Sequence, residues 1–100
     1  MKKALEAFQR TNAVAPAQII FYRDGVGEGQ VSAVCMPEIE MIKSAIKDAG
    51  LSTKLLFVNV CKRVNTRIFG GQAGKYQNPQ AGTVVDSVIT DKDAYEFYLV

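Results

Sequence analysis

The sequence predicts an α/β fold built on a strand–helix–strand unit. Two short runs, residues 18–23 and 54–61, are rich in β-branched and aromatic side chains, as buried strands are. Between them, residues 30–49 repeat apolar side chains mostly at three- and four-residue steps, the spacing of an amphipathic helix. A strand, a helix and a strand of these lengths form a βαβ unit, whose strands are parallel and whose crossover is right-handed.

Helix signals and helix breakers surround this unit. Good helix formers with helical apolar spacing predict a helix over residues 2–10, and Pro16 ends any helix before it. Pro37 lacks a backbone donor and disfavours helical geometry at Met36, so we expect the helix over residues 30–49 in two parts, with a kink or a restart at this point. Gly50 is a natural residue to end it.

The carboxyl-terminal part is predicted to hold a long loop and two further strands. The loop covers residues 68–80, which hold glycines and a proline, and such loops are usually functional or mobile. Strands are predicted over residues 82–90 and 95–100, with a turn at residues 91–93. Because the sequence stops on apolar residues inside the last predicted strand, we expect a truncated piece of a larger domain.

Composition excludes several classes of protein. The 100 residues have room for one core, and they hold no histidine, which excludes Ser-His-Asp and Cys-His mechanisms built from this chain alone. Cys35 and Cys61 lie far apart in apolar stretches, so buried, reduced thiols are favoured over a disulfide. The charged amino terminus does not resemble a signal peptide, and no apolar run reaches the ~20 residues of a membrane span. We therefore expect an intracellular protein.

Asp24 is the strongest candidate for chemistry. It follows the first predicted strand, and open α/β sheets place ligands at the carboxyl ends of their strands. The alternative is a turn aspartate that hydrogen-bonds the following backbone, as Asp-Gly pairs commonly do. The glycines of residues 25–29 have neither dinucleotide-binding nor P-loop spacing, and Asp86, inside an apolar run, is better explained by an outward-facing or hydrogen-bonded position.

The segment Lys62–Arg67 is the one dense group of cations in the sequence. It follows the second predicted strand and is therefore expected at the same sheet edge as Asp24. Arginine can contact phosphate through two hydrogen bonds, and the amide and hydroxyl of Asn65 and Thr66 can bind sugar or phosphate. A solvated basic loop is the alternative, but a neighbouring carboxylate with the capacity to bind metal favours a polyanionic ligand.

Several segments resemble the PIWI domain of the Argonaute/Piwi family. Residues 20–30, IFYRDGVGEGQ, resemble its YRDGV-x-EGQ segment, and residues 62–67, KRVNTR, its KR-x-x-TR segment. Asn78-Pro79 with residues 81–86 resembles its NP…GTVVD stretch, and residues 96–100, EFYLV, its closing strand. The matches keep the family's order over residues 16–100, with residues 1–15 as a leading helix and linker, and their details resemble the Piwi branch more than the Argonaute branch.

The resemblance implies a partial ribonuclease-H-like fold, with a mixed sheet and flanking helices around the βαβ unit. It also implies phosphodiester hydrolysis with Mg²⁺ or Mn²⁺ in the intact domain. Asp24 matches the family's second catalytic, metal-binding aspartate, and the remaining ligands are expected outside residues 1–100, so the chain alone is expected to be inactive. Lys62, Arg63 and Arg67 match residues that contact the guide backbone and the seed duplex.

The partners implied are a small guide RNA, a complementary target RNA, the rest of the PIWI domain and the neighbouring domain that binds the guide 5′ end. No membrane partner is expected, the localisation implied is cytoplasmic with the nucleus as a second option, and the isolated chain is expected to self-associate. Three hypotheses remain: part of an RNA-guided endoribonuclease in RNA silencing, a guide- and target-binding module that does not cleave, and a protein-interaction module without a nucleic-acid role.

Overall fold

The protein was studied as a computed structural model that describes residues 1–92 and 94–100. Asp93, which the sequence places in a turn, lies outside the described residues. The chain divides into two compact units, residues 1–64 and residues 65–100. Each unit is described by itself below.

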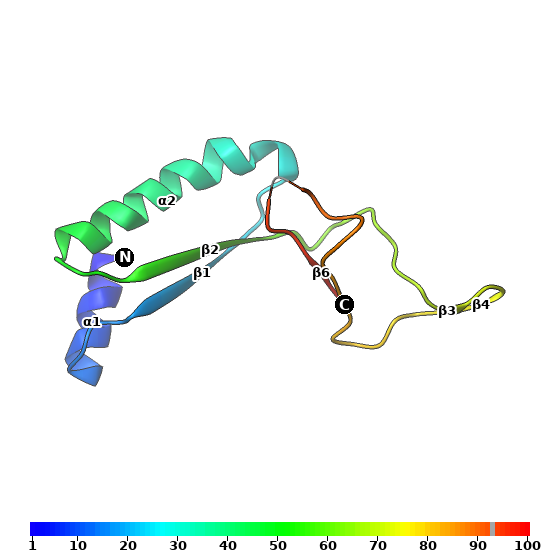
Figure 1. Ribbon diagram of the computed structural model, residues 1–100. Coiled ribbons are helices and arrows are strands. Elements are labelled where there is room, and N and C mark those ends of the chain that lie inside the picture. The colour runs from blue at the N-terminus through cyan, green and yellow to red at the C-terminus, as the bar shows by residue number, and fades with distance from the viewer. Residues whose placement is uncertain (93) are drawn as a thin grey trace. The chain divides into compact units, whose positions relative to one another are not determined.

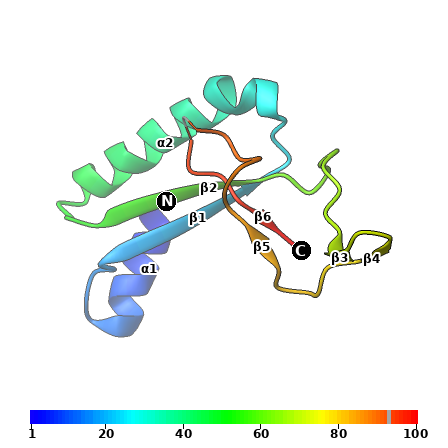
Figure 2. The same cartoon turned by 45° about the vertical axis from the view of Figure 1, so that its right-hand side comes forward.

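The first unit contains the predicted βαβ arrangement. Strand β1 (Gln18–Asp24) pairs in parallel with β2 (Lys54–Val60), residue for residue from Gln18 opposite Lys54 to Asp24 opposite Val60. Helix α2 (Val31–Asp48), preceded by the 3₁₀ turn η1 (Glu28–Gln30), connects them and lies along one face of the pair (Figures 1 and 2). The prediction of a parallel strand–helix–strand unit is confirmed.

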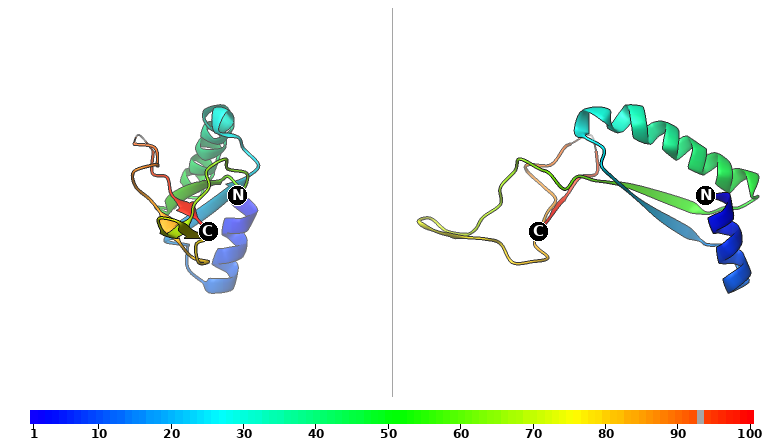
Figure 3. Two further views of the ribbon diagram at one scale, coloured as in Figure 1. Left: turned by 90° about the vertical axis from the view of Figure 1, so that its right-hand side faces the viewer. Right: turned by 180° about the vertical axis from the view of Figure 1, so that it is seen from behind.

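Apolar side chains from both helices and both strands form the core of this unit. Helix α1 (Lys2–Asn12) lies at the end of the strand pair where β1 begins (Figure 3). The buried members of the core are Leu5 of α1 and Ile42 and Ile46 of α2. Partly buried side chains complete it: Ile19, Phe21, Leu51, Leu55 and Phe57. The rings of Phe21 and Phe57 stack across the strands with centroids 5.2 Å apart. The core therefore lies between the sheet and the helices, at the amino ends of the strands.

The helices differ from the sequence prediction at two points. Helix α1 extends two residues past Arg10 and ends at Ala13 in a left-handed conformation, well before Pro16. Helix α2 is one continuous element with Pro37 inside it, so the expected restart at Met36 is wrong. Proline removes one hydrogen bond of the helix, but burial of Ile42, Ala45 and Ile46 on the sheet-facing side supports the helix across this position.

The opposite face of the β1–β2 pair is exposed. Alternation along β1 places Ile20 and Tyr22 on this face, 54% and 67% exposed, and Leu56 of β2 is 56% exposed opposite Ile20. Tyr22 therefore lies outside the core of this unit, although it is an aromatic residue within a strand. Asp24 continues the same alternation, so the carboxylate shares this face with exposed apolar side chains.

The second unit contains short two-stranded pairings. Strands β3 (Gly70–Gln72) and β4 (Lys75–Gln77) form an antiparallel hairpin inside the segment that the sequence predicts as a loop. Strands β5 (Val84–Val85) and β6 (Tyr98–Leu99) also pair antiparallel, each much shorter than the strand predicted there. Figure 2 shows both pairings. The loop prediction and the lengths of the last two predicted strands are therefore wrong.

Both cysteines carry free thiols, as the sequence predicts, but only Cys35 is buried. Strand β2 ends at Val60, so Cys61 falls just beyond the sheet and is exposed. Its sulfur contacts two polar groups, accepting from Asn59 Nδ2 and donating to the carbonyl of Val26, each at 3.6 Å. The Cys61 thiol therefore connects the turns that follow β1 and β2. None of the described helices is long and apolar enough to cross a membrane.

Candidate nucleic-acid interface

Asp24 and Lys62 meet at the carboxyl edge of the β1–β2 pair. Asp24 is the last residue of β1 and lies opposite Val60, the last residue of β2. Lys62 follows two residues later, and its Nζ lies 2.5 Å from Asp24 Oδ2. The side chains are 53% and 72% exposed, so both can reach a ligand in solution. The sequence predicted these residues at one edge, and the structure brings them into contact.

The electrostatics of this edge favour the ionised carboxylate. The pKa of Asp24 is lowered from its ordinary value, first by the hydrogen bond from Lys62 and then by the charge of that lysine, while partial desolvation acts in the opposite direction. The backbone N–H of Gly25 also donates to the carboxylate. A bond from the following backbone N–H is the one expected of a turn aspartate. Asp24 therefore also serves the turn after β1, which is the alternative role that the sequence indicated.

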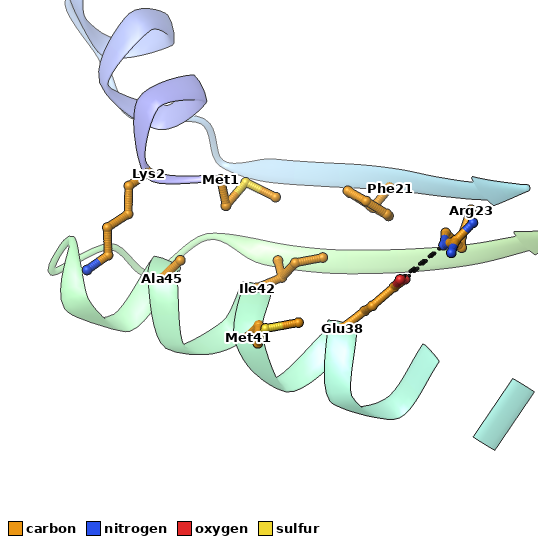
Figure 4. Close-up of a pocket in the computed structure, with 8 residues that line it drawn as sticks. All are labelled: Met1, Lys2, Phe21, Arg23, Glu38, Met41, Ile42 and Ala45. Atoms are coloured by element: carbon orange, nitrogen blue, oxygen red, sulfur yellow. Dashed lines mark hydrogen bonds and ion pairs between the residues drawn. The ribbon is translucent and has the colours of Figure 1, made fainter. Parts of the chain in front are cut away.

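Arg23 holds the end of β1 from the other side of the sheet. Its Nε donates to both carboxylate oxygens of Glu38 on α2, at 3.0 and 3.2 Å, and its guanidinium also donates to the backbone carbonyl of Asp24. These side chains are 35% and 29% exposed. Figure 4 shows them pointing toward each other across the space between strand and helix. Arg23 thereby fixes the backbone that carries Asp24.

The sequence did not lead us to predict the contact between Arg23 and Glu38, although the alternation of residues along β1 indicates it. Alternation along β1 places Arg23 on the same side as Ile19 and Phe21, which face the helix. A charge at a core-facing strand position requires a partner. Together with Met1, Lys2, Met41 and others, the two residues line an open hollow of about 400 Å³ on the helix side of the sheet (Figure 4). Asp24 does not line this hollow.

The other predicted contact residues are distributed over the two units. Lys62 and Arg63 belong to the first unit, whereas Asn65, Thr66 and Arg67 belong to the second. Arg63, Asn65 and Arg67 are exposed, and Thr66 is half-buried. The Arg67 guanidinium donates to the carbonyl of Thr66 at 3.4 Å. The predicted meeting with Asp24 is therefore seen for Lys62 and stays a prediction for the residues of the second unit.

The donor set at Asp24 fits one ligand of a magnesium ion. Magnesium prefers oxygen and is commonly bound through one or two carboxylates, with water and substrate phosphates completing the coordination. Asp24 offers an exposed carboxylate of this kind, and Lys62 occupies one of its oxygens. Among the side chains that the structure describes, which leave out those of Glu28 and Asp93, no group of three or more His, Cys, Asp or Glu is placed to hold a metal ion.

The fold and the edge define an α/β protein with a carboxylate and a lysine in contact at the carboxyl ends of parallel strands, the edge at which open α/β sheets place ligands. Comparison with known proteins gives the family. The Piwi domain model matches residues 1–100, so the chain belongs to the Piwi domain family. The resemblance drawn from the sequence motifs is thereby confirmed.

Individual relatives agree with this assignment. The chain is 44% identical over 99 residues to Piwi-like protein Siwi of Bombyx mori, covering 97% of this chain and 11% of that protein. It is 40% identical over 100 residues to Protein argonaute-3 of Drosophila melanogaster, with 97% and 11% covered. Piwi-like protein 1 of Danio rerio is 39% identical over 102 residues, with 100% and 12% covered. The chain thus spans about a ninth of the length of these relatives.

Proposed function

We propose that this chain is part of a guide-RNA-binding domain that acts in RNA silencing. In the intact protein, its sheet edge contributes a metal-binding carboxylate and phosphate contacts to RNA-guided cleavage of a target RNA. The observation that carries the proposal is the meeting of Asp24 and Lys62 at the carboxyl edge of two parallel strands, in a chain of the Piwi domain family. A ribonuclease-H-like topology for the whole domain belongs to the same proposal.

The chemistry assigned to each residue follows from its position. The hydrogen bond from Lys62 lowers the pKa of Asp24, and an ionised carboxylate is the form that binds a hard cation. A bound pair of Mg²⁺ ions would supply water activation and stabilisation of the leaving oxygen. Lys62, Arg63 and Arg67 neutralise backbone phosphates, and Asn65 and Thr66 add neutral hydrogen bonds to sugar or phosphate.

A second candidate is a module that binds guide and target without cleaving. The ion pair between Asp24 and Lys62 favours it, because a carboxylate neutralised by a lysine is already satisfied without metal. The substitution Asp24→Asn separates the two candidates. If Asp24 binds metal, the intact wild-type protein should cleave the target RNA and the substitution should abolish that cleavage. If the module only binds, wild type should not cleave, and the substitution should leave RNA affinity unchanged.

The proposal is tested by RNA binding to the intact protein across a salt series. The double variant Arg63→Ala/Arg67→Ala should bind more weakly. The slope of log affinity against log salt should become shallower by about 0.7 for each phosphate of single-stranded RNA that is no longer neutralised. The matched control Lys43→Ala/Lys47→Ala removes the same charge from helix α2 and should keep the slope. Equal slopes in both double variants would show a general charge effect and contradict phosphate contacts by the Lys62–Arg67 segment.

A further inference from the structure

The proposed function assigns Asp24 and Lys62 to different ligands, but in the structure the two side chains bind each other. The carboxylate is the proposed ligand of a cation, and the ammonium is the proposed partner of an RNA phosphate. In the structure they form a direct ion pair at 2.5 Å. Neither residue can serve its proposed ligand fully while this pair persists.

The pair is placed so that it can open at low cost. Both side chains are more than half exposed, and exposed ion pairs contribute little to stability because water and salt screen them. Lys62 lies beyond the last residue of β2, outside the strand pairing that fixes Val60. Its flexible stem and three rotatable donors suit it to changing partners.

Arg23 cannot take over from Lys62 at the carboxylate. Its guanidinium is bonded to Glu38 on the helix side of the sheet and to the backbone carbonyl of Asp24. Those bonds hold the strand end in place while the side chain of Lys62 moves. Of these two cations, the lysine is therefore the one that can move, and Arg23 is the one that is fixed.

We propose that Lys62 is an exchangeable counter-ion that couples RNA binding to metal binding. Without RNA, its ammonium neutralises Asp24 and competes with a metal ion for the carboxylate. With RNA bound, the ammonium moves to a backbone phosphate and releases the carboxylate to the metal ion. Because coupling between two binding sites is reciprocal, the metal ion raises RNA affinity by the same factor. This inference rests on the proposed function.

The experiment measures Mn²⁺ binding to the intact protein by the electron paramagnetic resonance signal of free Mn²⁺, with and without a single-stranded RNA oligonucleotide. A titration of the RNA alone is subtracted, since phosphates also bind Mn²⁺. Wild-type protein should bind Mn²⁺ about fivefold or more tightly when RNA is present. Lys62→Ala should bind Mn²⁺ more tightly than wild type without RNA, and RNA should add little further.

Two controls separate the possible failures. Lys43→Ala removes another exposed lysine from an ion pair, with Glu40 at 2.9 Å on α2, and should behave as wild type. Asp24→Asn should lose the Mn²⁺ site; if it binds Mn²⁺ as wild type does, the proposed metal site is wrong and the coupling falls with it. If Asp24→Asn loses Mn²⁺ binding but RNA raises the Mn²⁺ affinity of wild type and of Lys62→Ala by the same factor, the metal site at Asp24 is supported and the exchange by Lys62 is refuted.

Discussion

Ile46 provides a direct test of the packing that holds α2 on the sheet. Its side chain is only 6% exposed and clusters with Leu5 and Ile42. Replacing a buried isoleucine by alanine costs about 2–5 kcal/mol, because less apolar surface is buried and a cavity remains. At roughly 0.05–0.15 kcal/mol per residue, a unit the size of residues 1–64 has about 3–10 kcal/mol in all. Ile46→Ala should therefore remove a large part of that stability.

Hydrogen exchange of the backbone amides in α2 and β1 measures this change locally, whatever surrounds the unit. Ile46→Val deletes a single methylene and should lower the free energy of opening by about 0.5–1.5 kcal/mol, with Ile46→Ala lowering it by about 2–5 kcal/mol. The decrease should appear in both elements. A change confined to α2 would indicate that the helix and the strands do not share one cooperative core.

Met41→Ala is the matched control within the same helix. Met41 is 65% exposed, and surface substitutions usually change stability by no more than about 0.5 kcal/mol. The reasoning is refuted if Ile46→Ala and Met41→Ala lower amide protection equally, because burial would then not decide the cost.

Three further predictions concern charge and backbone. Lys62→Ala should raise the pKa of Asp24 toward its usual range, as measured in a carboxylate NMR titration. Because the pKa of Asp24 is lowered in the folded protein, its pairing with Lys62 stabilises the fold at pH values above the pKa of the unfolded state. This contribution to stability is lost as the pH falls through the pKa of the folded state. An unchanged pKa would contradict the ion pair. Pro37→Ala should stabilise α2 by about 1–3 kcal/mol in amide exchange by restoring a helix donor, and a decrease in protection would show that the helix depends on proline. Gly71→Ala should unprotect the β3–β4 hairpin because its Cβ would collide with the carbonyl of residue 75. Gly74→Ala meets no atom within 4 Å and should cost only the about 1–2 kcal/mol of its left-handed backbone; equal effects of the two glycine substitutions would exclude the collision.

The sequence predicted the first unit well because its signals are local and agree with one another. β-branched and aromatic runs mark β1 and β2, and the observed bounds differ from the prediction by one residue at the carboxyl end of each strand. The prediction at Pro37 considered only the one hydrogen bond that proline removes from the helix. It did not include the burial of the apolar residues that follow, which supports the helix across this position. Cys61 was misplaced for a related reason, since one residue decides whether a side chain lies inside a strand or beyond it.

The second unit was predicted poorly because strands there depend on partners. β-propensity over residues 82–90 predicts a full strand, but only Val84–Val85 finds a partner, in β6. Val88 has a left-handed backbone and is 98% exposed, which interrupts any longer strand. The β3–β4 hairpin was missed although Gly74 stands in its two-residue turn, a position that favours glycine.

For the candidate site, position along the strand was sufficient to select Asp24, and the dense cations selected Lys62. Their direct contact could not be predicted, because it depends on how the chain turns after Val60. From the sequence, the two residues are expected to act together on a ligand at one edge. The structure adds that they form an ion pair with each other.

The last two residues of β1 point to opposite faces of the sheet. Arg23 is anchored to the helix on one face, and Asp24 presents its carboxylate on the other. A twist of the strand end that redirected the carboxylate would also displace Arg23 relative to Glu38. The orientation of the Asp24 carboxylate is thus linked to an ion pair on the other face of the sheet. A substitution at Glu38 would change the orientation of a side chain that Glu38 does not contact.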